Sequence, residues 1–589
     1  MANKSNKSNK SKNRENQVTS NPMSRVTIVG EGLDEWRYRY LKLMVQGSTT
    51  SLPPYSMNQI ISDAESLYTD LSNTGANIFT PKAKRQLLEA LQDREQERPS
   101  FMVASHPGWH GRKCIVFPDK IFGKSKLPLE RAFGDLDQQM LAKYRIRGTL
   151  QEWQEQIWRL CAGNSRLIFV MSLAVAPMIL PLVKGPRSGG FQLYGPAETG
   201  KTAAAMAAGS FWGCHQAEGR RAKGFVESWH STAGKIEHTG LAHNHALLIP
   251  DETKRAGRTD RERVQVVTDV AVSLSEHTER ERLTNPASAR AGCCYFLSTS
   301  NASLDELAKA GGIDIDDAVR GRMVDVPLPF EGFGLYETLH EFSNGEELTD
   351  AIKARSLRVF GTPRHAFAKK LVKDAVDDRR KLKRWLERRR RQYLKALKRE
   401  LKKLKAAGIV LKPLKRASGR FATTFAAGSL AIKYGIFLLR RKELLAAILS
   451  CQIDGLRVAQ EIADDQKSAS SSRLRQRLIA YLNEHADELL DLCSHQLRRS
   501  EHKFGSVSGY VATFKGERWL HLTADQFKAI VGTGADASKL KKELANEGLM
   551  AKTKDRFVVQ RPIFSGAKTN KGHCSVHAFR ASILDRGDG

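Results

Sequence analysis

The sequence predicts an α/β protein with a parallel sheet flanked by helices, and three observations support this prediction. A glycine-rich loop at residues 195–202 stands between the apolar run Phe191–Tyr194 and the helix-forming run Ala203–Ala208. Two further apolar runs, at residues 246–249 and 293–297, each end in polar residues. Short apolar runs bounded by turn or helix signals are typical of buried parallel strands, whose polar ends gather at one edge of a sheet.

The length and the changes in composition predict several domains. At roughly 100–200 residues per domain, 589 residues have room for three or four domains and a large core. We divide the chain into a disordered basic tail (1–25), an N-terminal accessory domain (26–148), a core around the glycine-rich loop (149–335), a basic helical region or lid (336–505) and a C-terminal domain (506–589).

The charge of the chain predicts a polyanionic partner. Lys and Arg number 95 against 64 Asp and Glu, which gives a formal net charge of +31. Nucleic acid is the usual partner of such a protein, because neutralising phosphates releases counterions. The alternative is a protein whose excess charge lies in a disordered basic tail.

Cysteine usage and hydropathy favour a cytoplasmic protein. The eight cysteines are scattered and form no C-x-x-C pair, and His573, Cys574 and His577 lack an evident fourth ligand. The N-terminus has no apolar signal segment. Residues 167–183 are almost wholly apolar but contain Pro177 and Pro181, so we expect a buried core helix that breaks near Pro177, with a membrane span as the alternative.

The glycine-rich loop carries the strongest chemical signal. Its sequence has the full G-x-x-x-x-G-K-T pattern between a strand and a helix, which is the context that a phosphate-binding P-loop requires. Backbone N–H groups and the helix N-terminus would surround the phosphates, Lys201 would reach the β- and γ-phosphates, and Thr202 would bind Mg²⁺. A P-loop NTPase core that binds ATP and magnesium is therefore expected. Its nucleotide-binding residues are Gly195, Pro196, Ala197, Glu198, Thr199, Gly200, Lys201 and Thr202.

The second signal is the apolar run 246–249, which leads through Pro250 into Asp251 and Glu252. We expect Asp251 to hold the magnesium ion and Glu252 to orient and deprotonate the attacking water. Pro250 is compatible with a strand because it stands at the strand's exit.

Two further polar sites follow along the chain. After the run 293–297, Asn301 is the first choice for a residue that contacts the γ-phosphate and the water, with Thr299 and Ser300 as alternatives. Arg322, or second Arg320, precedes an alternating strand at 323–327 and is placed to reach the ATP of a neighbouring subunit.

Basic segments elsewhere predict nucleic-acid contacts. Between Arg364 and Lys405, 19 Lys or Arg stand against five Asp or Glu on a helix with regularly spaced leucines and with Trp385 and Tyr393. A solvated helix face with its aromatics on the buried side explains this pattern equally well. The order helix, helix, strand from Ala524 to Gln560 resembles a winged helix, with Lys539, Lys541 and Lys542 on the second helix. The segment between the second and third predicted strands is also basic. In a ring-shaped motor its cations would face the central channel and contact the phosphate backbone, and the alternative is that they are ordinary surface charges. These residues are Lys254, Arg255, Arg258, Arg280, Arg282 and Arg290.

Residues from about 108 to 432 resemble a helicase-like ATPase family of phages and chromosomal cassette elements, long catalogued as a domain of unknown function. The matching stretches are Gly108–Gly111, Leu150–Trp153, Phe191–Pro196 ahead of Gly200–Thr202, Ser228–Thr232, Leu247–Glu252, Gly361–Pro363, and Arg420–Ala422 followed by Ala426–Ala431. The resemblance implies an AAA+-like or hexameric-helicase core that works as a ring, with a hexamer as one form of that ring, and a C-terminal winged helix. The chain departs from the expected pattern at Asn244-His245, where an acidic residue would precede the carboxylate strand.

The combined prediction is an ATP-dependent nucleic-acid motor, with a DNA helicase or replication ATPase of a phage or mobile element as the leading reading. An AAA+-type switch or remodeller that binds DNA without unwinding it is the main alternative. A DNA-packaging motor and a non-enzymatic DNA-binding protein with a decayed site are further alternatives.

Overall fold

The computed structural model describes residues 26–92, 98–133, 141–185, 188–214, 224–229, 243–276, 293–492, 503–554, 556–563 and 573–586. The chain divides into two compact units, Met1–Arg457 and Val458–Gly589. Each unit is described by itself. The predicted basic tail lies outside the described residues.

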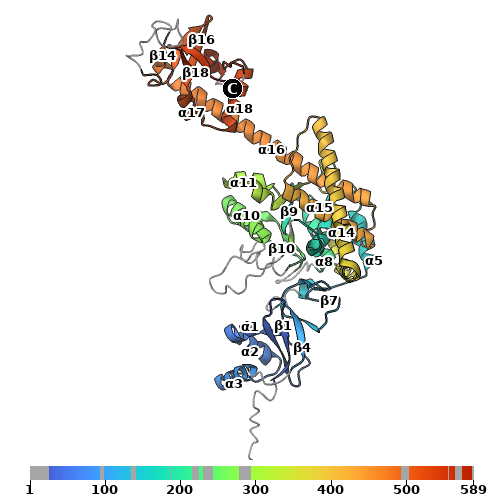
Figure 1. The fold of residues 1–589 in the computed structure, drawn as a ribbon. Helices are drawn as coiled ribbons and strands as arrows, with labels where there is room; N and C mark the ends of the chain where they lie inside the picture. The colour runs from blue at the N-terminus through green and yellow to red at the C-terminus, as the bar shows by residue number, and fades with distance from the viewer. Residues whose placement is uncertain are drawn as a thin grey trace, which may run out of the picture. The chain divides into compact units, whose positions relative to one another are not determined.

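The first unit begins with a five-stranded sheet of order β3-β2-β1-β4-β8 (Figure 1). Its strands are β1 (Val26–Leu33), β2 (Arg39–Val45), β3 (Tyr55–Ser56), β4 (Ser100–Ala104) and β8 (Leu129–Arg131). Helices α1 (Met57–Ser62), α2 (Ala64–Asn73) and α3 (Pro81–Gln92) contribute to the core on this sheet.

A small antiparallel sheet connects this region to the rest of the first unit. It consists of β5 (Gly108–His110), β6 (Cys114–Val116) and β7 (Ile121–Phe122). Short apolar runs at 101–104 and 114–117, on either side of Gly108–Gly111, predict two strands around a turn. Strands form at 100–104 and 114–116, but the predicted turn is wrong, since residues 108–110 form a strand and the turn follows at 111–113. Trp109, Ile115 and Phe117 pack in the same core as the central sheet, and the predicted boundary after residue 148 stays a prediction.

The central sheet is parallel throughout and has the order β10-β11-β12-β9-β13. Its strands are β9 (Gly189–Tyr194), β10 (Val226–Ser228), β11 (Leu247–Asp251), β12 (Tyr295–Ser300) and β13 (Met323–Pro327). Every residue of β9 and β12 is buried, as expected for inner strands covered on both faces. Gly189 and Gly190 are the first two residues of β9. A Cβ at Gly190 would lie 2.2 Å from the ring of Phe296 on the neighbouring strand, so this position requires glycine.

Helices cover both faces of this sheet. Leu247 and Leu297 point into the core that contains α7 (Ser165–Val175), η3 (Ala176–Leu182) and α8 (Lys201–Trp212). Leu248 and Phe296 point the other way, toward α10 (Asp260–Glu276) and α11 (Leu304–Gly311), and Figure 1 shows α8 on the opposite side of β9 from these two helices. The mixed α/β fold with a parallel sheet is thus confirmed.

The apolar stretch before the glycine-rich loop is a core element. Residues Ser165–Leu182 could cross a membrane by length and composition, but 89% of that stretch is buried inside the protein. The helix changes from α to 3-10 geometry at Ala176, directly before Pro177, as predicted.

Three long helices follow α12 (Asp317–Arg320) and α13 (Gly345–Ser356). They are α14 (Thr362–Ala406), which is kinked at Asp378, α15 (Lys415–Lys433) and α16 (Arg441–Glu484). The serine-rich run Ser468–Ser472 predicts an interruption between two helices, but this prediction is wrong, because α16 continues through the run. Serine is only slightly unfavourable inside a helix, and helix-forming residues flank this run.

The start of α14 is joined to distant parts of the first unit by a buried cation. Arg364 makes a two-pronged ion pair with Asp119, at 2.9 and 2.8 Å. It also donates to the carbonyl oxygens of Trp212, at the end of α8, and of Tyr144. The Arg364 side chain has no exposed surface, so this ion pair is a structural one.

The second unit holds a five-stranded sheet of order β14-β15-β16-β18-β17. Its strands are β14 (Leu490–Asp491), β15 (Tyr510–Phe514), β16 (Glu517–Thr523), β17 (Val559–Pro562) and β18 (His573–Arg580), and its helices are α17 (Ala524–Val531) and α18 (Ala535–Asn546). The two predicted helices of this region are confirmed. The sequence also predicts a strand at 556–560 and, before this region, a helix from Arg473 to about Leu497. The strand begins later, at Val559, and the helix that contains Arg473 ends at Glu484.

Candidate nucleotide-binding site

The glycine-rich loop joins β9 to α8 at the carboxyl edge of the central sheet. Gly200 caps α8 with φ +93°, and a Cβ at this position would lie 2.5 Å from the hydroxyl oxygen of Tyr336. Gly195, with φ +156°, would meet the side chain of Leu328 at the same distance. Both positions therefore require glycine, and the segment 328–336 packs directly beneath the loop.

Lys201 lies inside the curve of this loop. Its Nζ donates to the carbonyl oxygen of Gly195 at 2.9 Å, to that of Pro196, and to Thr199 Oγ1 at 3.3 Å. Burial lowers the pKa of Lys201, while the negative charge of Asp251 acts in the opposite direction. The ammonium group is therefore close enough to Asp251 for the two charges to interact.

Thr202 and Asp251 face each other from α8 and β11. Thr202 Oγ1 lies 3.2 Å from Asp251 Oδ2. Thr299, from the intervening strand β12, donates its hydroxyl hydrogen to Asp251 Oδ1. The structure thus brings a lysine, a hydroxyl and a carboxylate to one edge, and these residues fit a magnesium–triphosphate group, since hydroxyl and carboxylate oxygens are preferred ligands of Mg²⁺.

Glu252 follows β11 in a left-handed conformation, with φ +65°. Its backbone N–H donates to Thr299 Oγ1 at 2.9 Å, which fixes the turn. Its carboxylate forms an ion pair with Arg255 at 2.5 Å, and both side chains are about half exposed. A left-handed non-glycine residue is uncommon and often marks a functional position.

The residues at the end of β12 differ in what they contact. Thr299 binds Asp251 and Glu252, and Ser300 Oγ accepts a hydrogen bond from Thr253 at 2.8 Å. Asn301 is exposed, and its side chain makes no hydrogen bond within the described part of the chain. The role predicted for Asn301 stays a prediction, and the geometry draws attention to its alternative, Thr299.

The two candidate arginines lie at the opposite edge of the sheet. Met323 pairs with Gly190, at the start of β9, whereas the glycine-rich loop begins after Tyr194. Six residues of strand separate the level of Arg322 from the loop, which is about 20 Å at 3.3 Å per residue. Neither arginine therefore lies at the loop of its own subunit.

The environments of the two arginines also differ. Arg320 is paired with Asp305, at 2.9 and 3.0 Å, and more weakly with Asp317. The backbone beside Arg322 is held by Arg420, a buried residue of α15 that donates to the carbonyl oxygens of Gly321 and Ser188. Burial, together with the positive charges of Arg416 and Arg322, lowers the pKa of Arg420 to about 10.

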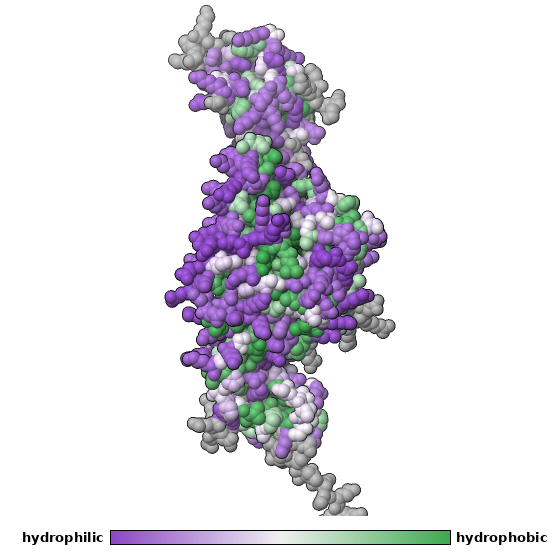
Figure 2. Space-filling model, turned by 90° about the vertical axis from the view of Figure 1, so that its right-hand side faces the viewer, coloured by the Kyte–Doolittle hydropathy of each residue, from purple (hydrophilic) through white to green (hydrophobic). Residues whose placement is uncertain are grey.

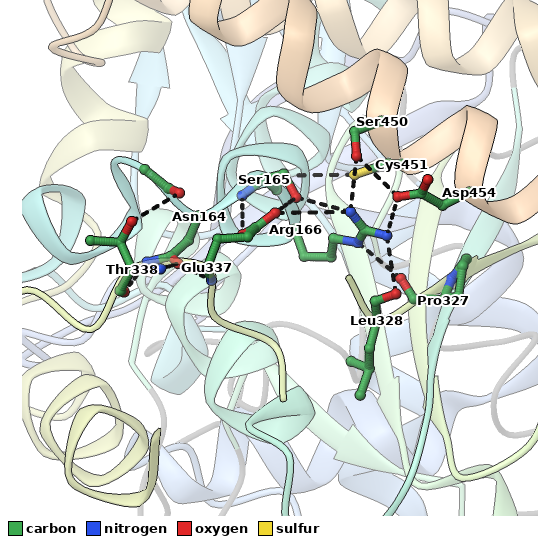
Figure 3. Close-up of polar contacts among 11 residues, drawn as sticks. Asn164, Ser165, Arg166, Pro327, Leu328, Glu337, Thr338, Ser450, Cys451 and Asp454 are labelled. Carbon is green, nitrogen blue, oxygen red and sulfur yellow. Dashed lines mark hydrogen bonds and ion pairs between the residues drawn. The ribbon is translucent and has the colours of Figure 1, made fainter. Parts of the chain in front are cut away.

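Sequence reasoning missed the residues that support the loop from below. Arg166, on α7, donates to the carbonyl oxygens of Pro327 and Leu328 and pairs with Asp454 on α16 at 2.7 Å (Figure 3). Glu337 accepts a hydrogen bond from the backbone N–H of Ser165 at 2.8 Å. A signal was available, since Arg166 is the only charged residue between Ser165 and Val183.

Most of the charged side chains of the long basic helix are exposed, whereas Arg364 and Arg390 are buried. Leu382, Leu386 and Leu397 are buried, and Tyr393 is fully buried with its hydroxyl donating to Gln452 at 2.8 Å. Leu394 is 39% exposed and so departs from the predicted leucine stripe. Figure 2 views the side on which α14 and α5 (Leu150–Trp153) lie in Figure 1, and its surface there is mostly hydrophilic. Trp385 is half-buried among cations, with Arg389 5.4 Å and Lys433 5.8 Å from its ring centroid.

The other predicted basic contacts are placed in part. Lys254 and Arg255 belong to the short helix after Glu252, whereas Arg280, Arg282 and Arg290 lie outside the described residues. On α18, Lys542 is exposed, but Lys541 lies over the ring of Phe527 at 4.7 Å.

Comparison with known proteins agrees with this architecture. A family model described as "Domain of unknown function (DUF927)" matches residues 3–291. No curated protein matches the chain. A solved structure described as "SCCmec type IV Cch - active helicase" is similar over 95% of this chain and 95% of that chain, with 15% sequence identity and a TM-score of 0.52. The chain therefore shares a mixed α/β fold, with parallel strands and flanking helices, with that helicase.

Proposed function

We propose that this protein is an ATP-hydrolysing, nucleic-acid-handling motor with a P-loop core of the AAA+ type, and that it acts as a DNA helicase or replication ATPase of a mobile element. The observation that carries the proposal is the meeting of Lys201, Thr202, Asp251 and Thr299 at one edge of a parallel sheet. Three of these residues stand at the positions that a P-loop ATPase needs for the phosphates and the metal.

In this proposal the residues around the loop have three roles, which are phosphate binding, metal binding and activation of the attacking water. The backbone N–H groups of residues 195–202 and the N-terminus of α8 bind the phosphates, and Lys201 turns from the loop carbonyls to the β- and γ-phosphates. Thr202 and Asp251 hold Mg²⁺, which supplies charge neutralisation at the phosphate oxygens when bound. Glu252 orients and deprotonates the attacking water after its carboxylate separates from Arg255.

The nucleic-acid half of the proposal rests on charge and on similarity. The net charge of +31 and the outward-facing cations of α14 provide the surface that a phosphate backbone requires. The similar solved structure is described as an active helicase of a cassette element, which favours DNA as the substrate. We further propose that the second unit is a winged-helix-like module and that the protein works as a homo-oligomeric ring in the cytoplasm.

The test is DNA-stimulated ATP hydrolysis and strand displacement by the wild-type protein and by Lys201→Ala. We expect the variant to lose at least 100-fold in hydrolysis and all detectable unwinding, because it lacks the γ-phosphate contact. Lys309→Ala, which changes an exposed lysine on α11, is the matched control. Unwinding that survives in Lys201→Ala would exclude the assigned site.

The ion pair between Glu252 and Arg255 favours a second candidate function. A base held by a cation hydrolyses ATP slowly, which suits a switch that binds DNA and remodels a partner without unwinding. DNA-stimulated hydrolysis without strand separation on forked or tailed duplexes would select this alternative.

A further inference from the structure

A histidine-rich cluster lies away from the nucleotide site, where the N-terminal region meets the small sheet. Glu35 belongs to the segment after β1, His106 lies two residues before β5, and His110 is the last residue of β5. One possible ligand atom from each of the three residues lies within 4.8 Å of the other two. His106 Nε2 is hydrogen bonded to Glu35 Oε1, and the rings of His106 and His110 stack with centroids 4.5 Å apart.

The two rings differ in which nitrogen can serve as a ligand. His110 Nε2 lies 2.7 Å from the carbonyl oxygen of His106, so its proton is assigned to Nε2 and Nδ1 keeps its lone pair. His106 Nε2 donates to the Glu35 carboxylate, and Nδ1 lies 2.8 Å from the carbonyl oxygen of Pro107 and 3.1 Å from the amide nitrogen of Asn244. A metal ion at His106 Nε2 would replace the proton there, and the remaining ring proton would then stand on Nδ1, facing Pro107. Metal-binding histidines usually donate their second ring N–H to a carbonyl or carboxylate in this way.

We propose that Glu35, His106 and His110 bind one divalent transition-metal ion of the zinc type, with water in the remaining position. Two imidazoles and one carboxylate form a ligand set that suits Zn²⁺ and its neighbours better than Mg²⁺, which prefers oxygen ligands. Tetrahedral bonds of about 2.1 Å place ligand atoms about 3.4 Å apart, so small side-chain rotations suffice.

The position of the cluster gives the ion a structural role. The segment 106–110 is docked on the central sheet, because the backbone N–H of Trp109 donates to His245 Nδ1 at 3.2 Å and Asn244 donates to the carbonyl oxygen of Pro107 at 2.7 Å. A Cβ at Gly108 would lie 2.1 Å from His245 Nδ1, so only glycine permits this approach. A metal ion would therefore connect the turn after β1, which carries Glu35, to a segment that is fixed on the core just before β11. This assignment does not depend on ATP hydrolysis.

The experiment uses the full chain, stripped with a chelator and free of nucleotide, and titrates it with Co²⁺ while visible absorbance is recorded. We expect one equivalent to bind with the d–d bands of a nitrogen- and oxygen-ligated site, and Zn²⁺ to displace it. Glu35→Gln, His106→Gln and His110→Gln should each weaken binding at least tenfold. Zn²⁺ should raise the melting temperature of the wild type but not that of Glu35→Gln.

Two control variants separate this site from others. Asp251→Asn removes the proposed magnesium ligand and should leave Co²⁺ binding unchanged, as should His573→Gln on β18. Glu35 is partly exposed, so its variant keeps the test valid even where His110→Gln fails to fold. The assignment is overturned when the wild type binds no stoichiometric Co²⁺, or when Glu35→Gln and His106→Gln bind it as the wild type does.

Discussion

The hydroxyl group of Thr299 links the two acidic residues of the candidate site. It donates to Asp251 Oδ1 and accepts from the backbone N–H of Glu252 at 2.9 Å. A single side chain on β12 thereby sets both the orientation of the proposed metal ligand and the turn that carries the proposed base. A hydroxyl can do this because it is donor and acceptor at once.

Thr299→Val tests this role, since valine keeps the shape and removes both hydrogen bonds. A hydrogen bond to a charged group contributes about 1.5–3 kcal/mol, so we expect ATP hydrolysis to fall roughly 10- to 100-fold. The measurement is kcat and KM for ATP, determined for the wild type, Thr299→Val and Asn301→Ala under the same conditions. A larger loss in Asn301→Ala than in Thr299→Val would return the sensor role to Asn301.

Asp325, on β13, makes stability depend on pH. It is partly buried and accepts hydrogen bonds from Gln192 at 2.9 Å and from the backbone N–H of Leu304 at 2.7 Å. Burial, reinforced by the charges of Asp305 and Glu306, raises the pKa of Asp325 to about 7. A raised folded-state pKa means that the folded protein holds the proton more tightly than the unfolded chain.

The stability from this proton is therefore complete below about pH 4 and is lost as the pH rises to about 7. The rise in the pKa of Asp325 to about 7 corresponds to at most about 4 kcal/mol of the free energy of unfolding. We expect Asp325→Asn, which cannot ionise, to gain in melting temperature relative to the wild type between pH 5 and pH 8. Parallel melting curves for the two proteins across this range would contradict the assignment.

At the scale of elements, Arg166 joins α7, α16 and the segment under the glycine-rich loop. Its guanidinium group is almost fully buried and contacts Pro327, Leu328 and Asp454 (Figure 3). Leu328 in turn is the residue that a side chain at Gly195 would strike. A change at the loop can therefore reach α16 through one buried cation.

Asp454→Asn tests the strength of this connection. Removing one partner of a buried ion pair costs about 3–5 kcal/mol, because the other charge stays buried without compensation. We expect a clear fall in the melting temperature of the first unit, measured by calorimetry. The double variant Arg166→Met, Asp454→Leu should recover much of the loss, and equal losses in both variants would contradict the ion-pair explanation.

The elements that the sequence could predict are those with local signals. Strands β9, β11 and β12 follow from apolar runs, and α8 follows from the loop motif that precedes it. Strand β10 could not be predicted, because Val226–Ser228 is short, only partly buried, and defined by pairing with β11. The contacts of Tyr336, Arg420 and Glu337 were missed for the same reason, since each joins residues far apart along the chain.

At the scale of the whole molecule, the glycine-rich loop and Arg322, two parts of the proposed catalytic machinery, lie at opposite edges of the central sheet. The glycine-rich loop lies at its carboxyl edge and Arg322 at the other, about 20 Å away by strand geometry. In the proposed mechanism, an arginine in this place would assist hydrolysis only at another subunit's nucleotide. The proposed role of Arg322 therefore depends on the proposed ring.

Mixing two inactive variants tests this arrangement. Lys201→Ala subunits would supply Arg322 to intact loops on Arg322→Ala subunits, so we expect mixed oligomers to regain part of the DNA-stimulated ATP hydrolysis. Each variant alone should be at least 100-fold impaired. Mixed oligomers that form, as judged by size measurement, yet remain as inactive as either parent would exclude the role of Arg322 in trans.

The pairing of Arg364 with Asp119 restricts how this protein can be shortened. A fragment that starts at residue 149 would keep the guanidinium group in the interior but discard its counter-ion and the ring of Phe117, 5.4 Å from it. Such a fragment would carry an uncompensated positive charge beside the end of α8. A minimal active fragment should therefore begin ahead of β5, so that it keeps the small sheet and Asp119, whose carboxylate neutralises Arg364.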